Sequence, residues 1–167
     1  NVPNDNIQKR IWFADDQTRP VTGGDPIEFF ENWLAHGTGG TCFPASGGLH
    51  ALLRAIGFNA NRISGSVIME GIEPDGNHGS VLVNLKGVDY LVDAQLGAFT
   101  VLPLVQGEPS STGDRIHDIR AVPVLGGFDV QWYPGSNRQD PVVMRPNLED
   151  GPVDHQFFLT HYDLSAS

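Results

Sequence analysis

Cys42 is the only cysteine among the 167 residues, and it directly follows the segment Thr38-Gly39-Gly40-Thr41. Downstream, apolar residues recur at the spacing of an amphipathic helix with one buried face: Leu49, Leu52, Leu53 and Ile56. Pro44 suits the first turn of this helix, and Gly57 suits its C-terminal cap. A thiol just ahead of a helix N-terminus lies near unsatisfied N–H groups and the positive end of the helix dipole, which lower its pKa. Cys42 is therefore the candidate nucleophile, and the alternative is a buried structural cysteine, the usual role of a lone one.

A β-hairpin is predicted further along the chain. Two predicted strands, His78–Leu85 and 88–93, flank Lys86-Gly87, which has the length of a two-residue hairpin turn. The shortest closure of this turn pairs Leu85 with Val88. That pairing fixes the register of every other residue in the two strands.

In this register Ser80 lies opposite Asp93, and His78 lies opposite Gln95. Side chains alternate between the two faces of a strand, so His78 and Asp93 point to the same face as diagonal neighbours. A shift of one residue would send them to opposite faces. If the helix that carries Cys42 packs beside this face, then a thiol, an imidazole and a carboxylate come together.

Such a group can perform nucleophilic catalysis. His78 would take the proton of the Cys42 thiol, and Asp93 would fix the tautomer of the ring and stabilise the imidazolium. Backbone N–H groups near Cys42 could hold a developing oxyanion, a contribution of about 3 kcal/mol per donor.

Other histidines and carboxylates suit these roles less well. His50 lies on the polar side of the Cys42 helix and is expected to face solvent, and His36 lies on a loop with no carboxylate at a fixed spacing. Asp89 shares the face of Asp93 but lies near the turn, where it is expected to be solvated. The sequence gives no mechanistic context to the remaining histidines: His117, His155 and His161.

Several other types of site lack support. Ser46 is not in a G-x-S-x-G motif, and Gly39-Gly40 is not followed by the rest of a phosphate-binding loop. The Asp and Glu residues show no metal-ligand spacing, so no metal site is predicted.

The elements that must position these residues point to an α+β fold. Asp25 and Pro26 are typical of a helix start, ahead of a short helix whose aromatic residues are expected in the core, and His36-Gly37 ends it. Residues 1–25 are polar and turn-rich, and residues 106–118 are expected to form a loop. Apolar runs predict strands at 61–69, 78–85, 88–93, 99–104, 120–125, 128–133, 141–144 and 156–159. We therefore expect short N-terminal helices followed by antiparallel sheet or a small β-barrel to the end, divided into segments 1–104 and 105–167.

Composition limits the partners and the compartment. The net charge of −10 argues against nucleic acid or an anionic membrane surface as the main partner. A single cysteine cannot form an internal disulfide, which favours a reducing, cytoplasmic location. No apolar run is long enough to cross a membrane as a helix. The chain begins at Asn1 without a methionine, so the lack of a visible signal peptide has little weight.

Taken together, these motifs resemble a known family, the arylamine N-acetyltransferases. In that family an R-G-G-x-C motif supplies the nucleophile, a histidine begins a strand of the next sheet, and an aspartate opens a D-x-x-x-G segment. The resemblance covers roughly residues 28–104, and 156–161 is similar to the segment that closes the family's β-barrel domain. The stretches that carry it are Gly39-Gly40-Thr41-Cys42-Phe43, Leu52–Phe58, the His78 strand, and Tyr90-Leu91-Val92-Asp93 continuing to Gly97.

The resemblance implies ping-pong acyl transfer through an acyl-cysteine. The donor would be acetyl-coenzyme A, used as a cosubstrate with no permanently bound cofactor. The acceptor would be an arylamine, an arylhydroxylamine or a hydrazine. Carried over by position, Phe43 would line the acyl pocket, and Asn77 and Gly97 would lie near the acyl donor. The oligomeric state is left open.

The chain also departs from the family pattern. Thr38 replaces the arginine before the two glycines, and Pro44 replaces an acidic or amide residue two positions after the cysteine. The helical segment before Cys42 is shorter than usual. The chain stops near the start of the family's C-terminal α/β lid, so that lid is predicted to be absent. Relatives that close macrocyclic antibiotics use the same triad without coenzyme A, so acyl chemistry is better supported than an arylamine substrate.

Two further functions remain open from the sequence. A hydrolase or protein-modifying enzyme on the transglutaminase-like scaffold also orders its triad Cys, His, Asp. Those enzymes often place a tryptophan beside the cysteine or the histidine, where this chain has Phe43 and Gly79. A catalytically inactive domain on the same scaffold is the third possibility.

Overall fold

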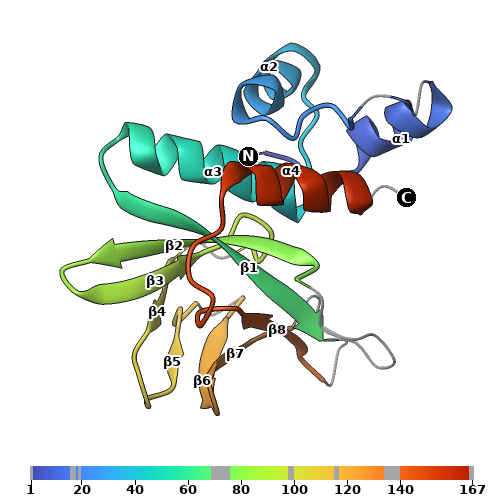
Figure 1. Ribbon diagram of the computed structural model, residues 1–167. Helices are drawn as coiled ribbons and strands as arrows, with labels where there is room; N and C mark the ends of the chain where they lie inside the picture. The colour runs from blue at the N-terminus through green and yellow to red at the C-terminus, as the bar shows by residue number, and fades with distance from the viewer. Residues whose placement is uncertain are drawn as a thin grey trace.

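The computed structural model describes residues 2–15, 18, 20–68, 76–97, 100–114, 117–133 and 140–165. Helices gather on one side of a single curved sheet (Figure 1). The predicted α+β fold is therefore confirmed. The helices are α1 (Ile7–Ala14), α2 (Pro26–His36), α3 (Cys42–Ala55) and α4 (His155–Leu164). Among the described residues, no helix is long and apolar enough to cross a membrane.

The sheet is antiparallel throughout, in the order β4-β3-β2-β1-β8-β7-β6-β5. Its two end strands approach each other, and the Ser110 hydroxyl of β5 donates to the Pro103 carbonyl of β4. The sheet therefore closes almost completely into a barrel. The strands are β1 (Asn59–Ile68), β2 (His78–Leu85), β3 (Val88–Val92), β4 (Leu102–Leu104), β5 (Ser110–Ser111), β6 (Arg120–Val124), β7 (Gly127–Trp132) and β8 (Val142–Pro146).

Apolar side chains from both halves of the sheet fill the barrel. The buried cluster consists of Ile63, Leu91, Leu96, Leu102, Leu104, Ile119, Ala121, Phe128, Val130 and Met144. β4 ends at Leu104, and the strands that follow it in the chain, β5 to β8, belong to the same sheet. The division into 1–104 and 105–167 stays a prediction about sequence segments.

The N-terminal half of α3 is the part that packs into the protein. Phe43 to Gly48 are all buried, whereas Leu52 is 50% exposed and Ile56 is 71% exposed. The predicted buried stripe is therefore wrong at Leu52 and Ile56, whereas Leu53 is half-buried and packs against the cluster of Ala60, Val81 and Val83. Small residues explain why the first turns of α3 pack closely against the rest of the protein. An added Cβ at Gly48 would lie 2.8 Å from the Phe29 ring, so α2 lies directly against the α3 backbone. The predicted cap is confirmed, since Gly57 follows the helix with a φ of 94°.

Two helices differ from the sequence prediction. The run 156–159, predicted as a strand, belongs to α4, because Asp154 caps the helix by accepting from the Phe157 N–H. Phe158 and Tyr162, four residues apart, are buried on one face of α4. The segment 1–25, which is polar and turn-rich in sequence, contains α1.

The remaining elements lie close to their predicted positions. Asp25 caps α2 by accepting from the Ile27 N–H at 2.8 Å, and Gly37 ends it in the left-handed region. Of the α2 aromatics, Phe29 is fully buried, while Phe30 and Trp33 are half-buried. The short strand β5 lies inside the predicted loop 106–118. Part of the strand predicted at 99–104 lies outside the described residues.

Candidate functional site

Cys42 is the first residue of α3, one position further into the helix than predicted, and Thr41 is the N-cap. The loop before it is held by the N-terminal segment. The Gly39 N–H donates to an Asp5 carboxylate oxygen at 2.8 Å, and the Gly40 N–H donates to the Pro3 carbonyl at 3.3 Å. An added Cβ at Gly39 would lie 1.7 Å from the Pro3 carbonyl oxygen, so only glycine fits there. The helix N-terminus is thereby presented with the thiol half-buried.

The β2–β3 hairpin has the predicted register. Leu85 pairs with Val88, and both turn residues have positive φ, 53° at Lys86 and 83° at Gly87. Positive φ at both central positions is the geometry of a type I′ hairpin turn.

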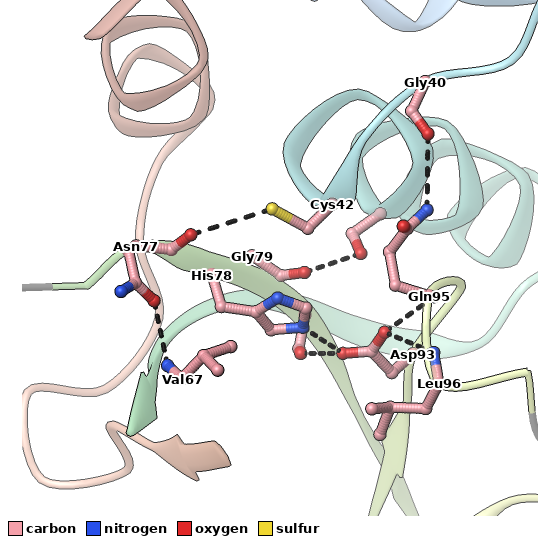
Figure 2. A network of polar contacts seen from close by, with 11 residues as sticks. Gly40, Cys42, Val67, Asn77, His78, Gly79, Asp93, Gln95 and Leu96 are labelled. Atoms are coloured by element: carbon pink, nitrogen blue, oxygen red, sulfur yellow. Dashed lines mark hydrogen bonds and ion pairs between the residues drawn. The ribbon is translucent and has the colours of Figure 1, made fainter. Parts of the chain in front are cut away.

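The register brings His78 and Asp93 together, as predicted. His78 Nε2 lies 2.7 Å from Asp93 Oδ2 (Figure 2). Because Nε2 is bonded to the carboxylate, Nδ1 is the ring nitrogen left for the thiol, and Figure 2 shows Cys42 on that side of the ring. Cys42 Sγ lies 3.8 Å from the Asn77 carbonyl oxygen, next to the start of β2.

Asp93 is enclosed by hydrogen-bond donors, and its side chain is only 1% exposed. Oδ1 accepts from the backbone N–H groups of Gln95 at 2.8 Å and Leu96 at 3.3 Å. Oδ2 accepts from the Ser80 hydroxyl as well as from His78. A buried carboxylate needs such donors to stay ionised.

The three ionisable groups shift one another's pKa values. Burial alone would raise the pKa of the Cys42 thiol, but the hydrogen bond and positive charge of His78, with the Gly79 N–H, outweigh burial and lower it. Burial alone would lower the pKa of His78, but the Asp93 carboxylate raises it from the ordinary 6.5 to about 10. Burial alone would raise the pKa of Asp93, yet His78 and Ser80 lower it. These directions favour a thiolate–imidazolium pair backed by a carboxylate.

Three further polar contacts fasten these elements together, and sequence reasoning missed their role. The fully buried Ser46 hydroxyl of α3 donates to the Gly79 carbonyl at 2.7 Å. The Gln95 amide donates to the Gly40 carbonyl at 3.4 Å, and Asn77 Oδ1 accepts from the Val67 N–H at 2.8 Å. No motif predicts such contacts, because each joins segments that are distant in the sequence.

The residues predicted to bind substrate occupy different surroundings. Phe43 is 2% exposed, and its ring meets Phe158 edge-on at 5.3 Å, so it belongs to the core beneath the site. The side chain of Asn77 fixes the backbone before His78. Gly97, with a φ of 68°, lies beside the His117 ring. Their roles toward substrate stay predictions.

The remaining histidines have other surroundings. His117 Nε2 lies 2.6 Å from the Leu96 carbonyl oxygen, and His155 pairs with Asp25 at 3.5 Å. His161 stacks on Phe157, and His36 is exposed at the end of α2. His50, expected to face solvent, is half-buried, and the charge of Arg62 contributes to lowering its pKa after desolvation. Asp89 accepts from Asn84 at the turn end of the hairpin.

A family model described as N-acetyltransferase matches residues 23–145. The chain belongs to the arylamine N-acetyltransferase family. The resemblance seen in the sequence is thus confirmed. No curated protein matches the sequence.

Solved structures of arylamine N-acetyltransferases share the fold. The Bacillus anthracis enzyme C superposes with a TM-score of 0.74 at 16% identity, over 99% of this chain and 64% of that one. The Mycobacterium marinum enzyme in complex with CoA gives 0.70 at 17% identity, over 89% and 56%. The Bacillus cereus enzyme, described with a unique Cys-His-Glu catalytic triad, gives 0.68 at 16% identity, over 98% and 70%. The chain spans less than two thirds of the first two proteins.

The departures from the N-acetyltransferase pattern have local structural explanations. Thr38 is 7% exposed, and its hydroxyl accepts from the Gln8 amide of α1 at 3.3 Å. The Thr38 hydroxyl therefore has an uncharged hydrogen-bond partner on α1. Pro44 is fully buried against Gly40, where an added Cβ would lie 2.7 Å from the proline ring.

A cavity of about 660 Å³ is lined by residues of β1, β8 and α4 and of the segments beside them, and Cys42, His78 and Asp93 are not among its lining residues. Gly76 and His161 form part of its wall. Gly76 directly precedes Asn77, whose carbonyl lies next to the Cys42 sulfur, and the His161 ring lies 5.7 Å from the Phe43 ring. The cavity is large enough for a drug-sized molecule.

Proposed function

We propose that this chain transfers an acyl group from acetyl-coenzyme A to an aromatic amine or hydrazine by a ping-pong mechanism through acyl-Cys42. The observation that carries this proposal is the 2.7 Å contact between His78 Nε2 and the buried Asp93 carboxylate, on the hairpin that faces the N-terminal thiol of α3. Family membership and the CoA complex of the Mycobacterium marinum relative support the choice of donor.

In the first half-reaction the Cys42 thiolate attacks the thioester carbonyl of the donor. The carbon–sulfur bond to coenzyme A breaks, and the departing thiolate takes the proton held by the His78 imidazolium. In the second half-reaction the amine attacks the acyl-cysteine carbonyl, and His78 accepts the proton that the amine loses. The Cys42 thiolate leaves, which regenerates the starting ion pair.

We assign the supporting roles by contact. Asp93 keeps the His78 imidazolium charged and holds Nδ1 toward the sulfur. The Gly79 N–H, which stabilises the thiolate, and the first N–H groups of α3 are the candidate oxyanion donors. The cavity beside Gly76 and His161 would receive a substrate. A cytoplasmic location would supply coenzyme A thioesters.

Intact mass measurement after incubation with acetyl-coenzyme A tests the proposal. We expect one acetyl group on the wild-type protein, none on Cys42→Ala, and loss of the group when an arylamine is added. Para-nitrophenyl acetate, an acetyl donor that carries no nucleotide, is the control for coenzyme A recognition. Acetylation by the ester alone would show a reactive thiol without coenzyme A recognition. No acetylation by either donor would refute the proposal and favour a catalytically inactive domain.

A further inference from the structure

Ser80 contacts the same carboxylate oxygen as the catalytic histidine candidate. It lies on β2 two residues after His78, on the same face, and is completely buried. Its hydroxyl donates to Asp93 Oδ2, the oxygen that lies 2.7 Å from His78 Nε2. One oxygen therefore accepts from two donors.

The other carboxylate oxygen is held independently. Asp93 Oδ1 accepts from the Gln95 and Leu96 backbone N–H groups. These four donors occupy the acceptor positions that a carboxylate offers. The backbone contacts hold Oδ1 without Ser80, so we expect the main effect of Ser80 to be on the charge of Oδ2 rather than on the position of the carboxylate.

Two donors on one oxygen divide its negative charge between them. The Ser80 hydroxyl contributes to lowering the pKa of Asp93, after the larger effect of the His78 ring. A carboxylate oxygen that shares its charge with a hydroxyl stabilises the imidazolium less than an unshared one would.

We propose that Ser80, acting through Asp93, limits the basicity of His78 by sharing the carboxylate oxygen to which the ring is hydrogen-bonded. The consequence for turnover rests on the proposed acyltransferase function, in which His78 must give up and regain a proton in every cycle. A ring that holds its proton too tightly returns it slowly to the leaving thiolate.

The groups that face His78 are few in the described structure. Cys42 faces it from α3, and Asp93 faces it from the loop after β3. Lys9 of α1 interacts electrostatically with Cys42. Substitution of Ser80 leaves all of these charges unchanged, so a shift in the His78 titration reports the hydrogen bond itself.

The test is the Ser80→Ala variant, followed by ¹⁵N NMR titration of the His78 ring. We expect the pKa of His78 to rise by about half a unit to one unit, the size that one hydrogen bond of ordinary net strength gives. The same titration is carried out in a Cys42→Ala background. This background lacks the thiolate, so the His78 transition should occur at lower pH. Ser80→Thr, which restores the hydroxyl, should return the pKa toward the wild-type value.

Ser46→Ala is the matched control. Ser46 is also a completely buried serine beside the same strand, but its hydroxyl donates to the Gly79 carbonyl instead of to Asp93. We expect this variant to lose stability without a change in the His78 pKa. An unchanged or lowered His78 pKa in Ser80→Ala, or an equal rise in Ser46→Ala, overturns the proposal.

The titration needs no substrate, so its outcome is separate from that of the acetylation assay. If the wild-type protein is acetylated on Cys42, the alkaline limb of its pH–rate profile should move upward in Ser80→Ala by the same amount as the NMR transition. An alkaline limb that stays in place while the NMR transition moves overturns the catalytic part of the proposal.

Discussion

Replacing Asp93 by asparagine should disable the site through the tautomer of His78. The backbone N–H groups of Gln95 and Leu96 both donate to Oδ1, so the amide oxygen of the introduced asparagine must stay on that side. The amide NH₂ group then faces His78 Nε2 and the Ser80 hydroxyl. Nε2 can only accept from an NH₂ group, which places the ring proton on Nδ1, toward the sulfur. A ring in this tautomer cannot take the thiol proton.

The loss of charge adds to the tautomer effect. Asp93 supplies the main interaction that raises the pKa of His78 to about 10, against the effect of burial. Without it the ring is mostly neutral at pH 7, and the thiolate loses its counterion. We expect the rate of Cys42 acetylation to fall by about 10³–10⁴-fold, as for the corresponding change in a serine triad.

The measurement is a single-turnover acetylation rate with acetyl-coenzyme A, together with the pH profile of Cys42 alkylation by iodoacetamide. Asp89→Asn is the matched control, because Asp89 lies on the same strand and accepts one hydrogen bond from Asn84 near the turn. We expect this control to stay within about threefold of wild type. A rate loss of less than about tenfold in Asp93→Asn would refute the tautomer argument.

Three further predictions concern the same contacts. His78→Ala should raise the pKa of the Cys42 thiol, and an unchanged iodoacetamide rate between about pH 5 and 8 would contradict the pairing. Gly79→Ala should lower the free energy of unfolding by about 1–3 kcal/mol in urea denaturation, because the added Cβ would lie 2.6 Å from the Phe43 ring, and wild-type stability would argue against this close contact. The folded-state pKa of Asp93 is lowered, so its contribution to stability is present above about pH 4 and is lost as the pH falls. The stability difference between wild type and Asp93→Asn should therefore shrink as the pH falls below about 4, and a constant difference would contradict it.

The hairpin could be predicted because its geometry is local. A two-residue turn fixes the pairing of Leu85 with Val88, and alternation of side chains then determines which residues share the face of His78. Neither step needs knowledge of distant segments. The same reasoning placed Ser80 opposite Asp93, but only the structure shows that its hydroxyl shares the oxygen bonded to His78.

The helices show where local reasoning failed. Residues 156–159 are an apolar run with no alternation, which suits a buried strand and one turn of a buried helix equally well. The outcome depends on Asp154 as a cap and on the packing of Phe158 against Phe43. For α3, the apolar stripe indicated one face, but the small residues of its first turns allow closer packing than the leucines do.

The distance between the thiol and the hairpin depends on two contacts at Gly79 that no sequence pattern predicts. Gly79 follows His78 directly, and its missing side chain lets β2 pass against the Phe43 ring at the start of α3. The Ser46 hydroxyl of α3 then donates a hydrogen bond to the Gly79 carbonyl of β2 and holds the helix against the strand. Phe43 and Ser46, on the helix that begins with Cys42, thus meet the residue that follows His78. The core beneath the site and the alignment of the proposed nucleophile and base therefore depend on the same packing, so a substitution at Gly79 should alter reactivity and stability together.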